Sequence, residues 1–458
     1  MVPCDLTKQV VAVLTRHVKP GQRLAVGLSG GVDSVALLTL LDELRYSFTF
    51  HLAAHHVNHQ ISPNAHDWAS FCAGLCEARA IGFTQSIVEV PRDGGKGLEA
   101  AARAARHGAF AQLPADFVVL AHQQDDQAET LLLRLLRGTG VKGLGAMEEC
   151  AALPAAPSQG GSATPRLLRP LLHVPRSVLL DYARAKGLKW IDDESNADAH
   201  HTRNYLRAQV LPRIEARFPA YRAVLDSMAA HSSESARLLD ALAAIDAATA
   251  VSGGQLAVEA LAALDSARAA NLLRFWLAQH RLKMPDRDRL GEMLRQATTA
   301  RADAAVRMDH DGIELRRFLG KLYAIRPLPE AKRELCVFLS GRLQWEIPAV
   351  GGTIIFSPCT DAGLARDALQ SRPVSVRLRQ GGERLRLAAN RPPQTLKNLL
   401  QAAGIPPWER ERLPLLYIGE RLAWVPSVGV DAAFQAGPGA EGLIPAWFPG
   451  KVVPGSGS

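Results

Sequence analysis

The chain has 458 residues, of which 47% are hydrophobic and 21% are charged, and it carries a formal net charge of +8 at pH 7. This composition excludes an intrinsically disordered protein, and the length predicts two or three domains with hydrophobic cores. Six cysteines in a chain of this length are too few for a disulfide framework. The sequence contains no run of about 18 apolar residues, the pattern that would indicate a membrane span. We therefore expect a cytoplasmic protein with no membrane partner.

Strand and helix patterns alternate over the N-terminal third of the chain. After an amphipathic helix pattern at residues 1–19, apolar runs predict strands at 24–28, 50–57, 84–90 and 117–121. Helix patterns follow them at 35–44, 65–80, 98–112 and 128–137. Because the two patterns alternate, we expect a doubly wound α/β domain with a parallel sheet, in which ligands bind beyond the carboxyl ends of the strands.

A glycine-rich loop joins the first strand of this domain to its first helix. It consists of Ser29, Gly30, Gly31, Val32, Asp33 and Ser34. Two glycines allow a sharp turn whose backbone N–H groups point at one anion, and the helix N-terminus and the serine hydroxyls add donors. The loop lacks the lysine of the G-x-x-x-x-G-K-[ST] loop, so it suits a departing pyrophosphate better than transfer of a γ-phosphoryl group. The alternative is an ordinary glycine turn.

The densest polar cluster, at residues 122–130, follows the fourth predicted strand and opens a helix. Three carboxylates in it, Asp125, Asp126 and Glu129, should face the same sheet edge as the glycine loop. Carboxylate oxygens coordinate Mg²⁺ or receive a substrate ammonium group. For Asp125, at a helix start, a plain N-cap is the alternative.

Several basic side chains are candidates for contact with the same ligands. Arg103 and Arg106 follow Glu99 on one predicted helix, where the alternative is a surface ion pair. Arg137 begins a second glycine-containing loop that can approach phosphates. Two weaker candidates follow. Arg169, before a proline, would supply a fixed guanidinium, and the acidic run 192–196 with Arg203 and Arg207 would position a cationic substrate or an RNA backbone.

Two groups of side chains have the residue types of metal sites but spacings that favour other roles. Cys72 and Cys76 lie four apart on one helix face, where packing as two small buried apolar groups is the preferred interpretation. Strand alternation places neighbouring histidines on opposite faces of a sheet. This argues against a metal site built from His51, His55, His56 and His59.

The rest of the chain changes in composition along its length. A flexible insertion at 151–165 and a helix at 176–186 precede helical periodicity with few turn signals at 219–295, which predicts a small helical domain. Beyond it the patterns predict short strands over 301–355, a mixed unit over 373–448 with one helix at 395–403, and a disordered tail at 454–458.

Positive charge is concentrated near the C-terminus. Between Ser371 and Arg421 there are ten Lys or Arg residues and four Glu residues, a net charge of +6. Such a segment is typical of a nucleic-acid-binding surface, with a solvated basic face as the alternative.

The hexapeptide 29–34 resembles the loop of the N-type ATP pyrophosphatases, which cleave ATP between its α- and β-phosphates. The motifs that follow resemble, in order, those of one family, the bacterial tRNA(Ile)-lysidine synthetases. The resemblance covers nearly the whole chain, with departures at Gln123 and Gln60, where the family usually has histidine and glycine. The matching motifs are His56–His59, Gly97–Arg103, Asp125–Thr130, Arg137–Gly140, Arg169–Leu172, Asp193–Asn196, Arg203–Asn204 and Leu396–Tyr417.

This resemblance implies a domain organisation. An α/β parallel-sheet PP-loop ATPase domain is followed by a small helical domain and a C-terminal mixed α/β domain. The implied segments are a catalytic domain at 1–217, a helical or mixed tRNA-binding domain at 218–330, a linker at 331–365, a basic tRNA-binding domain at 366–450 and a disordered tail at 451–458.

The resemblance also implies a reaction. The family joins L-lysine to C2 of the wobble cytidine in the CAU anticodon of an isoleucine tRNA. The reaction passes through an adenylated tRNA, releases AMP and pyrophosphate, and changes codon specificity from AUG to AUA. ATP is the implied co-substrate and Mg²⁺ the implied metal ion. The sequence does not determine the oligomeric state, for which a homodimer is one option.

Roles for individual residues follow from the same resemblance. The glycine loop would hold pyrophosphate, and Asp33 and Asp125 would hold Mg²⁺. As an alternative to binding Mg²⁺, Asp125 and Asp126 would hold the lysine amine, assisted by Glu129. Arg103 and Arg137 would stabilise negative charge developing on the phosphate.

Two other functions stay open at the level of the sequence. A tRNA thiolase shares the glycine loop, but thiolases commonly carry a C-x-x-C pair, which this chain lacks. A non-catalytic RNA-binding protein with a degenerate nucleotide fold is the second alternative. The intact glycine loop and the Asp125–Asp126 pair argue against it.

Overall fold

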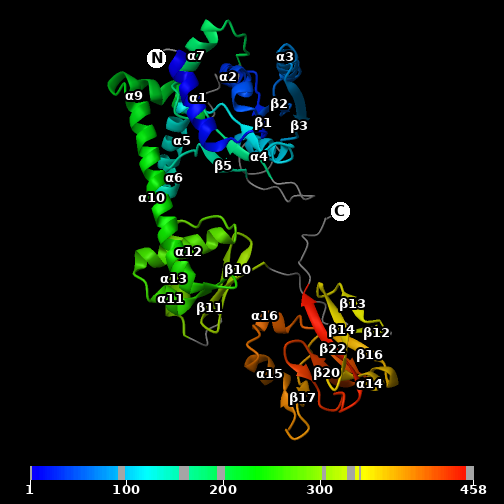
Figure 1. Cartoon of the computed structure of the whole chain (residues 1–458). Helices are drawn as coiled ribbons and strands as arrows, with labels where there is room; N and C mark the ends of the chain where they lie inside the picture. The colour runs from blue at the N-terminus through cyan, green and yellow to red at the C-terminus, as the bar shows by residue number, and fades with distance from the viewer. Residues whose placement is uncertain are drawn as a thin grey trace. The chain divides into compact units, whose positions relative to one another are not determined.

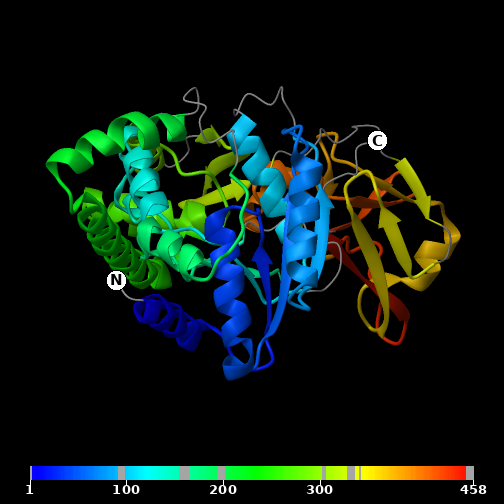
Figure 2. The same ribbon diagram turned by 90° about the horizontal axis from the view of Figure 1, so that it is seen from above.

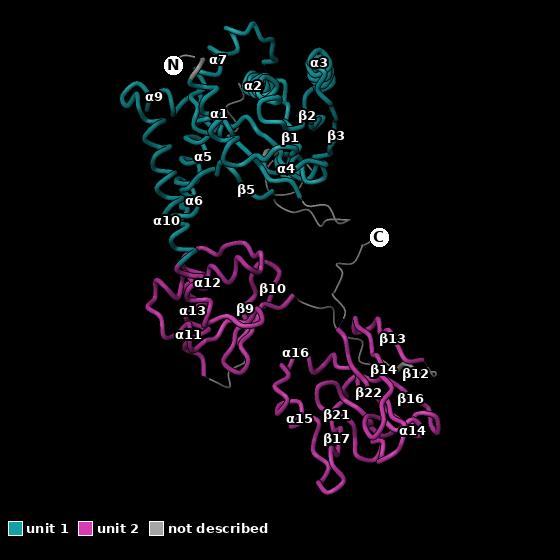
Figure 3. Tube along the Cα trace, in the orientation of Figure 1, with its two compact units in different colours: residues 1–241 teal, residues 242–458 magenta. Residues whose placement is uncertain are grey.

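The structure is a computed structural model, and it describes residues 3–90, 98–153, 164–192, 202–301, 306–326, 336–339 and 342–449. The chain divides into an N-terminal unit, Met1–Ala241, and a C-terminal unit, Leu242–Ser458 (Figure 3). The expected tail at 451–458 and the acidic motif at 193–196 lie outside the described residues. None of the described helices is long and apolar enough to cross a lipid bilayer.

A six-stranded sheet forms the centre of the N-terminal unit, in the order β3-β2-β1-β4-β6-β5. All neighbouring pairs are parallel except β5 and β6. The strands are β1 (Arg23–Gly27), β2 (His51–Asn58), β3 (Gly82–Ile87), β4 (Phe117–Val119), β5 (Cys150–Ala152) and β6 (Arg166–Leu168). The expected parallel-sheet α/β domain is confirmed. The insertion expected at 151–165 is partly a strand, since its first two residues belong to β5.

Helices cover both faces of this sheet, as the continuous burial of the central strands β1 and β4 requires. One face packs against α1, α2, α3 and α7, through a core that includes Val26, Leu38, Cys72 and Leu179. In Figures 1 and 2 α2 and α3 lie over the strands β1 to β3. The other face packs Val118 and its neighbours against Phe110 of α4. The helices are α1 (Pro3–His17), α2 (Val32–Phe48), α3 (Ala65–Glu77), α4 (Leu98–Phe110) and α7 (Arg176–Ala185).

The remaining helices of the N-terminal unit include α5, which carries the acidic cluster, and the helices that carry the arginines bound to it. They are α5 (Gln124–Leu136), α6 (Val141–Leu144), α8 (Thr202–Tyr205), the π-helix η2 (Leu206–Val210), α9 (Leu211–Arg217) and α10 (Tyr221–Ala250), whose last residues belong to the C-terminal unit. Ala128 of α5 packs against Leu211 and Tyr221, so α5, α9 and α10 share a small core.

The first part of the C-terminal unit pairs helices with a sheet. Helices α11 (Val258–Ala262), α12 (Ser266–Gln279) and α13 (Arg287–Thr299) share a core with the antiparallel sheet β7-β8-β11-β10-β9. Its strands are β7 (Val251–Ser252), β8 (Gln255–Ala257), β9 (Arg307–His310), β10 (Ile313–Phe318) and β11 (Lys321–Ile325). The expectation of a helical domain over 219–295 is therefore wrong at β7 and β8, where Gly253 and Gly254 form the turn of a short hairpin.

The second part is built mainly from two antiparallel sheets, in the orders β12-β16-β19-β20-β21 and β13-β14-β22-β15. Four strands lie in the segment 331–365, which we expected to be a linker, so that expectation is wrong for its described residues. Two of them pair with strands further along the chain, β12 with β16 and β14 with β22. These strands are β12 (Cys336–Leu339), β13 (Gln344–Ile347), β14 (Gly352–Thr360), β15 (Leu364–Ala365), β16 (Val374–Arg377), β19 (Leu415–Ile418), β20 (Arg421–Val425), β21 (Gly429–Val430) and β22 (Glu441–Pro449).

Smaller elements complete this part. The expected helix at 395–403 corresponds to α15. The hairpin β17–β18 precedes it, and two short helices flank the sheets. Their bounds are α14 (Arg366–Ser371), β17 (Arg384–Leu385), β18 (Gln394–Thr395), α15 (Leu396–Ala402) and α16 (Pro407–Arg410).

Candidate active site

The glycine loop, residues 29–34, turns between β1 and α2 at the carboxyl edge of the sheet. Gly30 has φ +90°, a conformation that favours glycine. A Cβ atom on Gly30 would lie 2.8 Å from Cδ1 of Ile191 and 3.3 Å from Sγ of Cys72. The Ser34 hydroxyl donates to the carbonyl of Gly31 over 2.9 Å. The close packing behind Gly30 therefore requires glycine and holds the loop in one shape.

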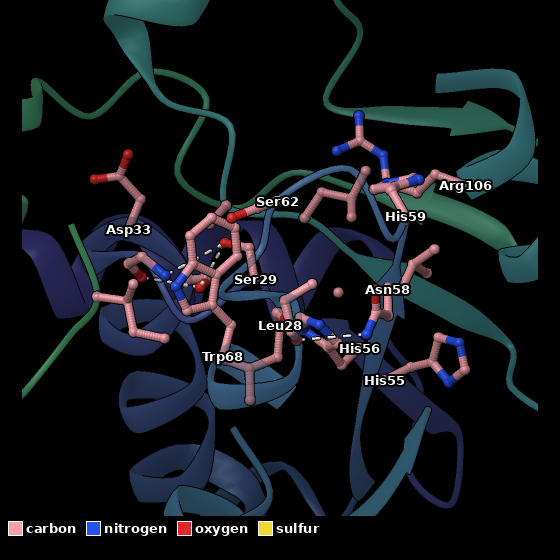
Figure 4. A pocket seen from close by; sticks show the side chains of 18 of the residues that line it. Leu28, Ser29, Asp33, His55, His56, Asn58, His59, Ser62, Trp68 and Arg106 are labelled. Carbon is pink, nitrogen blue, oxygen red and sulfur yellow. Dashed lines mark hydrogen bonds between the residues drawn. The ribbon is translucent and has the colours of Figure 1, made fainter. Parts of the chain in front are cut away.

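The loop forms one wall of a cavity of about 740 Å³, a size that suits a nucleotide. The carboxyl end of β2, residues 55–60, lines the cavity together with Trp68 of α3 and Arg106 of α4. In Figure 4, Asp33 and Trp68 lie on one side of this cavity, and His59 and Arg106 lie on the other.

Asp33, in the first turn of α2, is a largely buried carboxylate whose negative charge has few neighbouring donors or cations to stabilise it. Its Oδ1 accepts no hydrogen bond from any residue that the structure describes. Its Oδ2 lies 3.9 Å from Nε of Arg176. Burial raises the pKa of Asp33 to about 6, with Arg176 opposing the shift and Asp126 adding to it. An unpaired buried carboxylate oxygen beside a phosphate loop fits Mg²⁺, which usually takes one or two carboxylates together with substrate phosphates.

Binding of MgATP is expected to tighten as the pH rises through about 6, because only the ionised Asp33 attracts the metal ion. Calorimetric titration with MgATP between pH 5 and pH 8 measures this effect (roughly the range over which such a carboxyl titrates). ATP titrates in the same range, so the informative quantity is the difference from the Asp33→Asn variant. An identical pH profile for the two proteins would contradict the role of Asp33.

Asp126 and Glu129 of α5 form a buried ionic network with two arginines. Glu129 is fully buried, and its two oxygens each lie 2.6 Å from one guanidinium, Nε of Arg203 and Nε of Arg207. Asp126 Oδ1 accepts from Nη2 of Arg203 over 2.8 Å. Burial raises the pKa of Asp126, and the charge of Arg203 opposes that rise. These carboxylates are therefore neutralised by protein groups, unlike Asp33.

The two arginines that bind Glu129 come from consecutive helical elements. Arg203 lies in α8, and Arg207 lies within the wider turns of η2 that follow. A π-turn adds one residue to the helical repeat and is common at functional sites. The spacing of four residues favours one shared helix face for Arg203 and Arg207, but the sequence contains no simple signal for the π-turn or for Glu129 as their common partner.

Asp125 contacts a different arginine. Its Oδ1 lies 2.5 Å from Nε of Arg222, at the start of α10, and Arg222 also binds Glu215 of α9. Its Oδ2 accepts from the backbone N–H of Arg176 over 3.3 Å. Because Arg222 already neutralises Asp125, Asp33 is the better candidate for the metal ion. Within the described part of the chain no three His, Cys, Asp or Glu side chains form a metal-binding group.

Five predicted catalytic residues do not line the cavity, namely Asp125, Asp126 and Glu129 of the ionic contacts described above, together with Arg103 and Arg137. Arg137 follows the last residue of α5, about 18 Å along the helix axis from Asp125. It is exposed and does not line the cavity. Arg103 is also exposed, although Arg106 of the same helix does line the cavity. Four side chains that sequence reasoning did not single out belong to the site, namely Trp68, Arg176, Ile191 and Arg222.

The two departures from the family pattern have local explanations. Gln123 caps α5, since its Oε1 accepts from the N–H of Asp125 and its own N–H donates to Asp126. Gln60 has φ +53°, where glycine would be less strained, and its N–H donates to Oδ1 of Asn58.

The histidines and cysteines that have the residue types of metal sites make structural contacts in the fold. His56 Nδ1 contacts the carbonyl oxygen of Leu28, and His55 Nδ1 contacts the Thr84 hydroxyl. Burial lowers the pKa of both imidazoles. Cys72 and Cys76 are free and fully buried in the core, as the sequence predicts.

Family models match three segments of the chain. Residues 5–214 match the PP-loop domain, residues 256–323 the TilS substrate binding domain, and residues 374–447 the TilS substrate C-terminal domain. The first segment contains the glycine loop and the buried ionic network. The third contains the basic stretch near the C-terminus.

Curated relatives extend the similarity to nearly the whole chain. The tRNA(Ile)-lysidine synthase of Nitrosomonas europaea is 41% identical over 452 residues, which cover 98% of this chain and 97% of the relative. That of Azoarcus sp. (strain BH72) is 44% identical over 440 residues, 95% of this chain and 93% of the relative. Among solved structures, the U34-tRNA thiolase NcsA from Methanococcus maripaludis with its 4Fe–4S cluster has a TM-score of 0.42 and 20% identity, covering 50% of this chain and 79% of that one.

Proposed function

Because the chain belongs to the tRNA(Ile)-lysidine synthase family of tRNA-modifying ligases, we propose that it joins L-lysine to C2 of the wobble cytidine in the CAU anticodon of isoleucine tRNA. The change would convert the codon specificity of that tRNA from AUG to AUA. The observation that carries the proposal is the glycine loop, which opens a nucleotide-sized cavity beside Asp33, whose Oδ1 accepts no hydrogen bond from the described residues.

In the first step the C2 carbonyl oxygen of cytosine attacks the α-phosphate of ATP. The P–O bond to the β-phosphate breaks, and pyrophosphate leaves. Backbone N–H groups of Gly31 and Val32, with the hydroxyls of Ser29 and Ser34, stabilise the departing charge at the N-terminus of α2. Asp33 would hold Mg²⁺, which supplies charge neutralisation at the phosphates when bound.

In the second step the ε-amine of lysine attacks C2 of the adenylated base, and AMP leaves. The ammonium group of free lysine, with a reference pKa near 10.4, must first lose a proton. Asp126 is the preferred acceptor, because burial raises its pKa and thereby its basicity. Glu129, bound by Arg203 and Arg207, keeps those two cations in place beside Asp126. Asp125 would orient the amine.

The mass of the modified nucleoside tests this function. After incubation of isoleucine tRNA with ATP and lysine, digestion should release a nucleoside with the mass of cytidine plus lysine minus one water. AMP and pyrophosphate should accumulate in equal amounts. Unmodified cytidine with no release of AMP would refute the proposal, and a sulfur-containing nucleoside formed with a sulfur donor would favour the thiolase alternative.

Deletion of residues 327–458 is expected to weaken tRNA binding at least about tenfold, because it removes the basic segment 371–421 and its phosphate contacts. The KM for ATP should change less than about twofold, since the glycine loop and Asp33 lie in the N-terminal unit. Filter binding and steady-state kinetics measure the two effects. A shorter deletion of 366–458 serves as a comparison, because it separates β14 from β22 and should aggregate. Unchanged tRNA affinity after the longer deletion would contradict this assignment.

A further inference from the structure

Four arginines and two histidines gather beside the cavity, a group that we call the arginine cluster. It comprises Arg103, Arg106, Arg134, Arg169, His107 and His122. Arg169 is 5% exposed, and its Nε lies 3.2 Å from Nδ1 of His122. Arg169 also donates to the carbonyl of Glu148 over 2.7 Å, and Arg134 donates to that of Ala146 over 2.6 Å. Both guanidinium groups therefore hold the same short segment of backbone before β5.

Arg103 adds a further positive charge to this crowded region. Burial, followed by the charge of Arg103, lowers the pKa of Arg134 and lowers that of Arg169 to about 10. Burial, followed by Arg103 and Arg106, lowers the pKa of His107 to about 4. The guanidinium group of Arg103 is exposed. The carboxylate of Glu148 opposes the lowering of the pKa of Arg134 and Arg169 but does not cancel it. The cluster thus has an excess of positive charge that a bound anion would relieve.

The arginine cluster lies at the edge of the nucleotide-sized cavity. Arg106 and His122 line the cavity, and Arg103 lies one turn before Arg106 on α4. In Figure 4 Arg106 is on the side of the cavity away from Asp33. An anion at the cluster and a pyrophosphate at the glycine loop would therefore occupy opposite sides of one cavity.

We propose that the arginine cluster binds a backbone phosphate of the RNA substrate next to the nucleotide that enters the cavity. This inference rests on the proposed function, because the target base must reach the α-phosphate of ATP while its own backbone stays outside. Guanidinium groups bind phosphate oxygens in a bidentate manner, which would fix the base relative to the glycine loop. The same chemistry could serve the phosphates of ATP, and the experiment separates these two sources.

The Arg103→Gln variant tests the proposal, because an exposed helix residue can be replaced with little effect on the fold. Its dissociation constant for tRNA should rise roughly tenfold near physiological salt. The slope of log K against log salt should become shallower by about 0.7, the value for one phosphate contact in a single strand. The KM for ATP should stay within about twofold of the wild-type value. Arg103→Lys should restore most of the salt slope, because it keeps the charge.

Arg184→Gln is the matched control, since Arg184 is an arginine on α7 that is 68% exposed and distant in sequence from the cluster. It should leave both the tRNA affinity and the salt slope unchanged. An Arg103→Gln variant with wild-type tRNA affinity and slope would overturn the proposal. A rise in the KM for ATP without a change in tRNA binding would assign the cluster to the nucleotide instead. Lysidine formation by the wild-type protein tests the proposed function separately.

Discussion

Replacing Asp33 by asparagine is expected to lower AMP release and lysidine formation by at least about 10³-fold, because the amide cannot neutralise the metal ion that balances the phosphate charge. Binding of tRNA should be unchanged, since Asp33 lies within the nucleotide cavity. The same substitution should stabilise the N-terminal unit. The Oδ1 atom of Asp33 is buried without a hydrogen-bond donor from the described residues, so the ionised carboxylate destabilises the fold.

The pH dependence of this stabilisation follows from the direction of the pKa shift. In the folded protein the pKa of Asp33 is raised from 3.8 to about 6, so the folded state holds a proton that the unfolded state has lost. The wild-type protein therefore loses stability, relative to the asparagine variant, as the pH rises from about 4 to about 6. Above that range the variant should be more stable by about 1–3 kcal/mol.

Calorimetric melting of both proteins at several pH values measures the stability, and AMP release in the presence of lysine measures the activity. Asp5→Asn is a suitable control, because Asp5 also lies in the first turn of a helix, is exposed, and is remote from the cavity. It should change neither quantity. Near-normal turnover of the Asp33→Asn variant would eliminate Asp33 from the mechanism.

Replacing Glu129 by alanine is expected to destabilise the N-terminal unit by about 3–5 kcal/mol, because it leaves two partly buried guanidinium groups without their carboxylate. Both oxygens of Glu129 lie 2.6 Å from arginine nitrogens, and its side chain is fully buried. Activity should fall with stability, since Arg203 would no longer be held beside Asp126. Glu129→Gln should lose less, because its amide oxygen still accepts a hydrogen bond from one of the arginines.

A double-mutant cycle with Arg207→Ala isolates the interaction from the cavity that the substitution creates. Thermal unfolding of the N-terminal unit is the measurement, and a coupling energy of about 1–3 kcal/mol is expected for contacting residues. Glu234→Ala, at an exposed position of α10, is the control and should be neutral. An alanine variant at position 129 with wild-type stability would show that the network contributes nothing to the fold.

Much of the N-terminal unit is predictable from local pattern. The predicted strand at 24–28 corresponds to β1 and the predicted helix at 65–80 to α3, because hydrophobic periodicity reports which faces are buried. The glycine loop is equally predictable from the sequence, since Gly30 adopts a backbone conformation that few other residues tolerate. The proximity of the loop to the acidic cluster follows from the topology of parallel strands.

The partners of the carboxylates could not be predicted, because they depend on helix packing between distant segments. Arg222 reaches Asp125 from 97 residues away, and no local signal connects them. Short strands were predicted over 301–355, but the partners of β12 and β14 could not be predicted for a similar reason, since each pairs with a strand further along the chain. Arg137 lies at the opposite end of α5 from Asp125. The length of this helix therefore separates Arg137 from the acidic cluster.

The extra residue in η2 has a consequence for how this gene can vary. Deleting one amino acid from Leu206–Val210 would remove this extra residue and restore ordinary α-helical winding, while the side chains beyond the deletion would keep nearly their present orientation. The same deletion inside the regular helix α9 would instead turn every side chain beyond it by about 100° around the axis. Changes of one residue in length should therefore persist during evolution in the π-helix more readily than in the helix that follows it.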